Sequence, residues 1–293
     1  MVAVNKLTAA LALTAALALG PGAMAQPAAL TQQAQPPLWQ SLKDPIRPAA
    51  PLESGKIKWQ GAQLHYAIYG KGRPVVLLHD SLGNSDYWGN QVGPLSQSYQ
   101  VVLIDTRGHG RSTRSDDPYS YGLLADDVFQ VMRKLRLEGA AVVGWGDGAI
   151  TALELTRRHP GWVRELVMFG GNYSLAGLKP GAEQNPTFAG YARKAIADYK
   201  RMAPAADFDG LFTAMRAMWS KEPAYTAGQL ADVKVPTTVI VAEHDEMVRR
   251  EHSEEMARLI PGAQLVMLPG LSHFAPWQDS RKFNDVLKIV LDY

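Results

Sequence analysis

The chain has 293 residues, of which 46% are hydrophobic and 20% are charged, and its formal net charge is +2. This balance is that of an ordinary globular protein, and it excludes the strongly basic surface that non-specific nucleic-acid binding requires. There is no cysteine, and the seven histidines show no spacing typical of metal ligands, so we expect no metal site and no cofactor.

The first 25 residues have the pattern of a secretory signal peptide. Lys6 precedes the apolar run 7–19, and the small residues Ala23-Met24-Ala25 follow a Gly-Pro break. The run is shorter than the roughly 20 residues that a membrane-spanning helix needs. We therefore expect cleavage after Ala25, a periplasmic or secreted bacterial protein, and no stable membrane insertion after cleavage. Residues 26–55, which are rich in Pro, Gln and Ala, are expected to form a flexible tether.

The mature protein recovered from a periplasmic extract should therefore begin at Gln26, because the small residues at 23 and 25 suit the signal peptidase. Intact-mass spectrometry measures this directly. A mass that includes residues 1–25 would contradict the prediction of an exported protein.

From residue 56 onward, strand and helix patterns alternate. Two alternating segments, 56–59 and 63–69, are joined by a hairpin signal at Gln60-Gly61-Ala62. Further strands are indicated at 74–79, 100–105, 140–143, 163–169, 237–242 and 264–268, and helices at 86–96, 121–137, 149–159, 253–260 and 283–291. We expect an α/β fold with a mostly parallel, eight-stranded sheet and helices on both faces, all within residues 56–293.

The alternation breaks between residues 172 and 231. Helical patterns at 188–202 and 208–219 carry methionines and aromatic residues, including Met215 and Trp219. An insertion at this point of a parallel sheet lies over the carboxyl ends of the strands, where open α/β sheets bind ligands. We expect a small helical cap whose apolar face, with Met215 and Trp219, lines a substrate pocket.

The segment Gly144-Trp145-Gly146-Asp147-Gly148-Ala149 joins a strand to a helix through a sharp turn. Small residues two before and two after position 146 fit the crowding at such a turn. The turn resembles the nucleophile elbow G-x-S-x-G of the α/β-hydrolases, which implies a nucleophilic serine at position 146, but this chain has glycine there. We expect Gly146 to have a positive φ, and a serine placed there to be tolerated and to lie near His273.

Five motifs in chain order resemble the α/β-hydrolase superfamily, and the resemblance covers residues 56–293. They are Leu78-His79-Asp80-Ser81-Leu82-Gly83, the loop 105–112, the turn 144–149, Ala242-Glu243-His244-Asp245, and Gly270-Leu271-Ser272-His273-Phe274. Within the superfamily, the chain most resembles the capped esterases, lactonases and carbon–carbon bond hydrolases.

The resemblance implies a role for each site residue. His273 would be the general base and Asp245 would orient it, with Glu243 and Glu246 as possible substitutes. The backbone N–H groups of Ser81 and Asp147 would form the oxyanion hole. Trp145 would line the pocket beside the vacant nucleophile position. Asp80 and Ser81 depart from the usual glycines, and a carboxylate at position 80 would oppose an oxyanion unless it pointed away.

Asp147 would be the nucleophile if the register shifted by one residue, as in epoxide hydrolases and haloalkane dehalogenases. That shift would put Trp145 where the turn requires a small residue, so we reject it.

Three functions remain open. The chain could be a hydrolase of a small ester, lactone or related acyl substrate, in which His273 and Asp245 activate a water molecule in the space left by the serine. It could instead be an inactive pseudoenzyme or ligand-binding protein, or an engineered nucleophile-less variant of a serine esterase. In each case the expected partner is a small molecule, neither nucleic acid nor membrane, and no oligomeric state follows from the residues.

Overall fold

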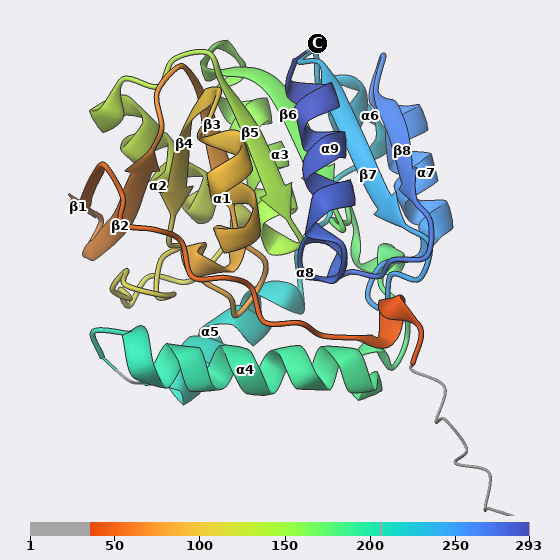
Figure 1. Cartoon of the computed structure of the whole chain (residues 1–293), viewed down its shortest axis with the longest axis horizontal. Coiled ribbons are helices and arrows are strands. Elements are labelled where there is room, and N and C mark those ends of the chain that lie inside the picture. Colours follow the sequence, from red (N-terminus) through yellow and green to blue (C-terminus); the bar gives the residue numbers. More distant parts are fainter. Residues whose placement is uncertain (1–35, 206, 293) are drawn as a thin grey trace, which may run out of the picture. The chain divides into compact units, whose positions relative to one another are not determined.

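The strands of the computed structural model form one eight-stranded sheet, in the order β1-β2-β4-β3-β5-β6-β7-β8 (Figure 1). The structure describes residues 36–205 and 207–292. The strands are β1 (Glu53–Trp59), β2 (Ala62–Tyr69), β3 (Arg73–Leu78), β4 (Tyr99–Ile104), β5 (Ala140–Trp145), β6 (Val163–Phe169), β7 (Thr237–Ala242) and β8 (Gln264–Leu268). Only β2 is antiparallel to its neighbours, β1 and β4. The remaining strands, in the order β4-β3-β5-β6-β7-β8, are all parallel. The prediction of a mostly parallel sheet is confirmed.

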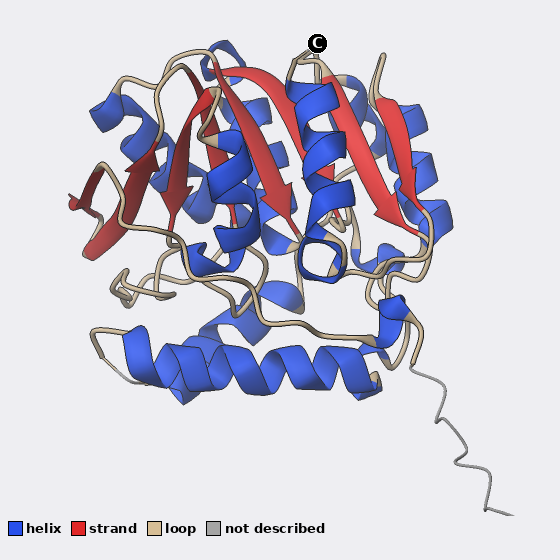
Figure 2. Cartoon of the chain, viewed as in Figure 1, coloured by secondary structure: helices blue, strands red, loops and turns tan. Residues whose placement is uncertain are grey.

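Helices cover both faces of the sheet (Figure 2). The helices are α1 (Gly89–Leu95), α2 (Tyr121–Leu135), α3 (Asp147–Arg158), α4 (Pro186–Met202), α5 (Phe208–Trp219), α6 (Ala227–Ala231), α7 (Arg250–Leu259), α8 (Ala275–Gln278) and α9 (Ser280–Leu291). One core packs α2, α3 and α7 against one face, and a second packs α1, α8 and α9 against the other. Alternate residues of β3 belong to opposite cores, Val76 to the first and Val75 to the second, because side chains alternate along a strand. This explains the continuous apolar runs, since a strand covered on both faces is apolar at every position.

Helices α4 and α5 lie between β6 and β7 in the chain and cross the carboxyl ends of the strands as a cap (Figure 1). Helix α4 begins after Asn185, whose side chain accepts hydrogen bonds from the N–H groups of Thr187 and Phe188, and Pro186 occupies its first position. Asp207 caps α5 in the same way. The cap therefore occurs where the strand–helix alternation breaks in the sequence. None of the helices in the described ranges is long and apolar enough to cross a membrane.

The segment 36–52 is packed against the domain, which differs from the flexible tether expected for residues 26–55. The Trp39 ring stacks on His244 at 4.5 Å, and the Gln278 side-chain amide donates to the carbonyls of Trp39 and Ser41. Asp44 pairs with Lys194 of the cap helix α4 at 2.9 Å. The tether prediction failed here because these anchors lie at least 150 residues away in the chain, beyond the reach of a local composition argument. The rest of the predicted tether and the predicted signal peptide lie outside the described residues.

Candidate active site

The turn between β5 and α3 places Gly146 at a tight corner. Its φ is 55° and its ψ is −119°, so the predicted positive φ is confirmed. The neighbouring small residues are required sterically, because a Cβ at Gly144 would overlap the backbone of Gly148, and one at Gly148 would overlap the backbone of Leu78. The corner is thus the turn that the sequence predicts, with an unusual residue at its tip.

The space beside Gly146 is filled by the carboxylate of Asp80. A Cβ built on Gly146 would overlap Asp80 Oδ1 and approach its carboxyl carbon. Asp80 follows β3, whose end pairs with the end of β5 through Leu78 and Gly144, and its side chain is buried. The expectation of a vacant, water-sized space is therefore wrong, and Asp80 does not point away. In place of a serine hydroxyl on the turn, the site holds a carboxylate from the neighbouring loop.

Three groups surround the Asp80 carboxylate. Its Oδ1 accepts a hydrogen bond from the backbone N–H of Asp147 at 3.3 Å, and another from the Ser81 hydroxyl at 3.3 Å. Its Oδ2 lies 3.5 Å from His273 Nε2. The N–H of Asp147 is one of the two predicted oxyanion donors, so this donor already binds an oxygen of the protein itself.

His79 holds the backbone of the Asp80 loop. Its Nε2 accepts a hydrogen bond from the N–H of Thr106, so its Nδ1 carries the proton and donates to the carbonyl of Asp80 at 2.8 Å. Burial lowers the pKa of His79, which keeps the ring in this neutral form. The OH of Tyr191 in α4 donates to the carbonyl of Ser81 at 2.6 Å, so core and cap both fix the loop.

On its other side, His273 contacts Asp245. The distance from His273 Nδ1 to Asp245 Oδ2 is 3.0 Å, and Asp245 Oδ1 accepts hydrogen bonds from the N–H groups of Met247 and Val248 at 2.8 Å. Glu246 accepts from the backbone N–H of His273, and Glu243 accepts from that of Gly270. The two alternative carboxylates thus hold the loop, and Asp245 is the one that faces Nδ1.

His273 lies between two carboxylates, and this sets its charge. Burial disfavours the charged ring, but Asp245 and Asp80 together outweigh it and raise the pKa of His273 well above its usual range. These two carboxylates therefore favour the imidazolium form of the ring. A protonated ring cannot act as the general base that the resemblance implies.

Asp147 connects the turn to the cap. Its carboxylate accepts hydrogen bonds from the Tyr121 hydroxyl at 2.7 Å and from Trp219 Nε1 at 2.8 Å. Burial, and next the charge of Asp80, raise the pKa of Asp147 from 3.8 to about 7, although the bonds from Tyr121 and Trp219 oppose this shift. Trp219 thus contacts the site through Asp147, an arrangement that spacing along the cap helix could not indicate.

The raised pKa of Asp147 predicts a pH dependence of stability. The unfolded chain ionises this group near 3.8 and the folded chain near 7, so the folded state binds more protons in between. The free energy of unfolding should therefore lose this contribution as pH rises from about 4 to about 7. Asp147→Asn should remove that loss, because an amide can still accept from Trp219 and donate to Tyr121 without titrating.

Urea denaturation of wild type and Asp147→Asn across this pH range measures the effect. The difference in unfolding free energy, wild type minus variant, should decrease steadily with pH. If the two proteins lose stability in parallel as pH rises, the pKa of Asp147 is not raised in the folded state. The result would then also contradict the effects of Asp80 and His273, the charged groups that face Asp147, on this pKa.

A narrow cavity of about 10 Å³, with room for about one water molecule, adjoins the site. Its walls come from the loops after β3 and β4, from α3 and from the cap, and comprise His79, Asp80, Ser81, Thr106, His109, Leu124, Asp147, Gly148, Thr151 and Met215. Met215 of the cap forms part of this wall. Trp145, which was expected to line a substrate pocket, is instead fully buried in the core, where its ring packs against Trp88, Trp277 and His273. The turn contributes Asp147 and Gly148 to the cavity wall, whereas the residue before its tip points into the core.

His109 is a cavity residue that the sequence reasoning missed. It is 1% exposed, and its Nδ1 lies 2.9 Å from the Arg107 carbonyl, which can only accept, so Nδ1 carries the proton. Burial, aided by His79, lowers the pKa of His109 to about 3, and its Nε2 has no hydrogen-bond partner. His109 therefore presents an unused acceptor in the cavity wall. Its place in the loop 105–112 was the only available signal.

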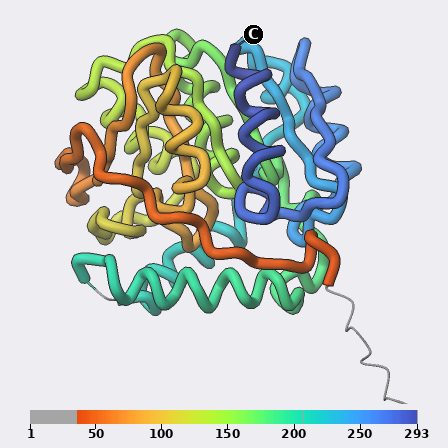
Figure 3. Tube along the Cα trace, viewed as in Figure 1, coloured from red at the N-terminus to blue at the C-terminus, as the bar shows by residue number. Residues whose placement is uncertain are grey.

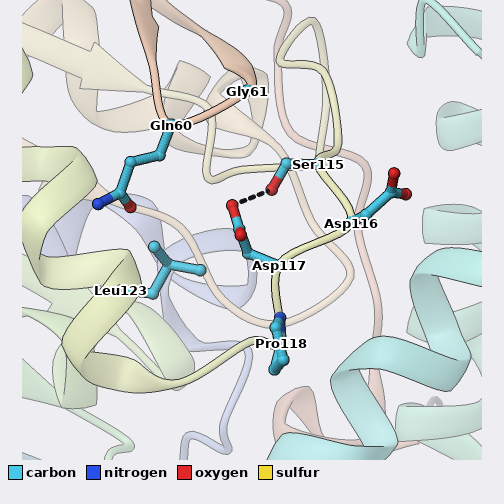
Figure 4. Close-up of a pocket in the computed structure, with 7 residues that line it drawn as sticks. All are labelled: Gln60, Gly61, Ser115, Asp116, Asp117, Pro118 and Leu123. Atoms are coloured by element: carbon cyan, nitrogen blue, oxygen red, sulfur yellow. Dashed lines mark hydrogen bonds between the residues drawn. The ribbon is translucent and has the colours of Figure 1, made fainter.

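A second depression lies on the surface beside the β1–β2 hairpin (Figure 4). It shares no lining residue with the cavity at Asp80 and consists of Gln60, Gly61, Ser115, Asp116, Asp117, Pro118 and Leu123. Within residues 36–205 and 207–292, no group of three or more potential ligands could hold a metal ion.

Comparison with known proteins places these observations in a family. The chain is 24% identical to the mouse serine hydrolase BPHL over 82% of this chain and 87% of the mouse protein. It is 28% identical to a putative carbamate hydrolase RutD of Azorhizobium caulinodans, over 77% of this chain and 94% of that protein.

The solved structures agree in fold. An N-acyl homoserine lactone degrading enzyme superposes with a TM-score of 0.68 at 26% identity, covering 80% of this chain and 99% of the other. A meta-cleavage product hydrolase from Pseudomonas fluorescens gives a TM-score of 0.70 at 22% identity, over 79% and 95% of the two chains. The model of the alpha/beta hydrolase family matches residues 75–286. The chain belongs to the alpha/beta hydrolase family.

Proposed function

We propose that this protein is an exported hydrolase of small ester, lactone or related substrates, whose chemistry runs through Asp80, His273 and Asp245 instead of a serine on the turn. The observation that carries the proposal is the position of the Asp80 carboxylate. It occupies the space of a side chain at position 146 and lies between the N–H of Asp147 and the ring of His273. Relatives described as serine, carbamate and lactone hydrolases support a hydrolytic reaction.

A carboxylate in this position can act as a nucleophile. Attack by Asp80 on an electrophilic carbon forms a covalent intermediate and neutralises its charge. Of the two carboxylates that raise the pKa of His273, only Asp245 then keeps its charge. The pKa of the ring falls, and the ring can release its proton to the leaving group. Neutral His273, oriented by Asp245, next takes a proton from a water molecule that attacks the intermediate. Hydrolysis returns Asp80 to its carboxylate form.

A broad screen of short-chain esters and lactones tests the proposal. Wild type should hydrolyse at least one substrate, and His273→Ala should lower kcat/KM by at least about 10³-fold, the usual scale for a catalytic histidine. Asp285→Asn, an exposed carboxylate on α9, is the matched control and should keep full activity. Equal rates in wild type and His273→Ala would overturn the proposal.

A ligand-binding protein is the second candidate, favoured by one observation. Asp80, His273 and Asp245 satisfy one another, and the adjoining cavity is small. If the screen finds no turnover and a screened compound nevertheless raises the melting temperature, this second function replaces the first.

A further inference from the structure

We propose that the N-terminal segment 38–46 is a strap that positions the His273–Asp245 pair, and that Gln278 of α8 is the positioning residue through which it acts. The inference rests on the proposed function, because it concerns the geometry of the same two residues. The segment, drawn in red-orange in Figure 3, runs alongside the cap helix α4. It contacts both loops that carry the pair, and it also contacts the cap.

The side-chain amide of Gln278 joins the strap to the loop of His273. Its Oε1 accepts a hydrogen bond from the N–H of Ser272 at 2.9 Å, and its Nε2 lies 2.9 Å from Ser272 Oγ. The same nitrogen lies 3.0 Å from the carbonyl oxygen of Trp39 and 2.9 Å from that of Ser41. Gln278 and Ser272 are both buried, and Ser272 directly precedes His273. One amide group therefore separates the strap from the backbone that holds the ring.

The strap carbonyls determine which way this amide faces. A carbonyl oxygen only accepts, so the two carbonyls require the NH₂ end of the amide, and its oxygen is left for the N–H of Ser272. In a flipped amide, the oxygen would face two carbonyl oxygens, and a buried backbone N–H would lose its acceptor. The strap thus stabilises the one orientation of Gln278 that holds the chain just before His273.

The indole ring of Trp39 covers the loop of Asp245. It stacks on His244, with ring centroids 4.5 Å apart and planes inclined by 24°. His244 directly precedes Asp245, and its N–H donates to the carbonyl of Leu271 at 2.9 Å, which ties the two loops together. The strap therefore contacts the chain next to each member of the pair.

Few contacts hold the rest of the strap. Asp44 forms an ion pair with Lys194 of α4 at 2.9 Å, and the side chain of Leu42 lies against Gly190 of the same helix. Every residue of the strap is exposed or half-buried. Truncating the two half-buried anchors Trp39 and Leu42 should therefore release the strap without removing a fully buried side chain.

The variant Trp39→Ala/Leu42→Ala tests the inference in the full chain. The first readout is the low-field NMR signal of the proton between His273 Nδ1 and Asp245, which needs no substrate and is identified by its loss in His273→Gln. We expect this signal to broaden and move upfield, because the distance from Nδ1 to Oδ2, 3.0 Å in the structure, is no longer fixed.

The second readout is turnover of a substrate from the ester and lactone screen. The strap contributes no residue to the cavity wall, so KM should change little. The value of kcat should fall about ten- to a hundredfold, the scale expected for a small misplacement of a reacting group. Leu38→Ala/Ile46→Ala is the matched control, since these apolar side chains of the same segment are 38% and 63% exposed. It should leave the signal and kcat unchanged.

A double-mutant cycle tests the role of Gln278. Gln278→Met removes the amide at similar side-chain volume and should lower kcat by itself. Adding Trp39→Ala/Leu42→Ala should then cost less than it costs in wild type, because the connection through Gln278 is already broken. Losses that multiply in full would overturn the assignment of Gln278.

The outcomes separate this inference from the proposed function. If the anchor variant keeps the NMR signal and kcat of wild type, the strap does not position the pair, and the proposed function stands. A fall in kcat with an unchanged signal overturns the inference as well, because the strap would then act elsewhere. If wild type hydrolyses nothing in the screen, the proposed function fails, and the NMR comparison still decides whether the strap holds the pair.

Discussion

The double variant Asp80→Gly/Gly146→Ser should react with a fluorophosphonate probe, whereas Gly146→Ser alone should not. A serine at position 146 needs the space that Asp80 Oδ1 occupies, so the single variant has to displace a buried carboxylate. Overpacking of this kind costs about 1–3 kcal/mol, and a β-carbon at positive φ adds about 1–2 kcal/mol. The single variant should therefore be destabilised and unreactive, which revises the expectation from sequence that a serine here is tolerated.

Removing the Asp80 carboxylate changes three things together. It gives the serine side chain its space, frees the N–H of Asp147 to stabilise an oxyanion, and removes the charge that keeps His273 protonated. The double variant then has a nucleophile next to a neutral, oriented ring. Labelling should vanish when His273→Ala is added, and Asp80→Gly without the serine should not label. A folded double variant that stays inert would show that the ring and the turn are not aligned for serine chemistry.

Most of the fold was predictable from the sequence, because apolar periodicity and turn residues are local. The strands around Val76 and Val142 and the corner at Gly146 are encoded in this way. The sequence marks Asp80 and Gly146 as two separate departures from the family pattern. Their complementarity depends on β3 and β5 being adjacent, so that residues 66 positions apart share one space. The predicted parallel sheet does contain a signal for this contact, because Asp80 and Gly146 each follow a strand and the two strands, β3 and β5, are neighbours.

This complementarity also bears on whether Gly146 is an engineered replacement for a serine. A serine deletion alone would leave a void, whereas here a second residue fills it and contacts His273. Gly146 and Asp80 are thus a matched pair, and any side chain at position 146 would conflict with the carboxylate. The remaining contacts at Trp219 and Trp145 depend on side-chain directions at the turn, which periodicity does not specify.

Asp80→Asn should abolish turnover without unfolding the protein. The amide has the shape of the carboxylate, and its oxygen can still accept from the N–H of Asp147 while its NH₂ group faces His273 Nε2. The substitution removes the nucleophile and the charge together, so kcat/KM on any substrate found in the screen should fall by at least about 10³-fold. Circular dichroism and the melting temperature serve as the controls for folding. Turnover that survives in Asp80→Asn would assign the chemistry to other groups.

The most direct test of the role of Asp80 is the pKa of His273, which needs no substrate. An NMR titration of the ring in wild type and in Asp80→Asn, from pH 5 to 9, compares the ring with and without the second carboxylate. Because Asp80 and Asp245 together raise the pKa of His273, wild type should stay protonated through neutral pH, and Asp80→Asn should lose its ring proton at lower pH. If His273 titrates at the same pH in both proteins, Asp80 does not act on the ring, and a carboxylate in place of the missing serine is not the centre of this site.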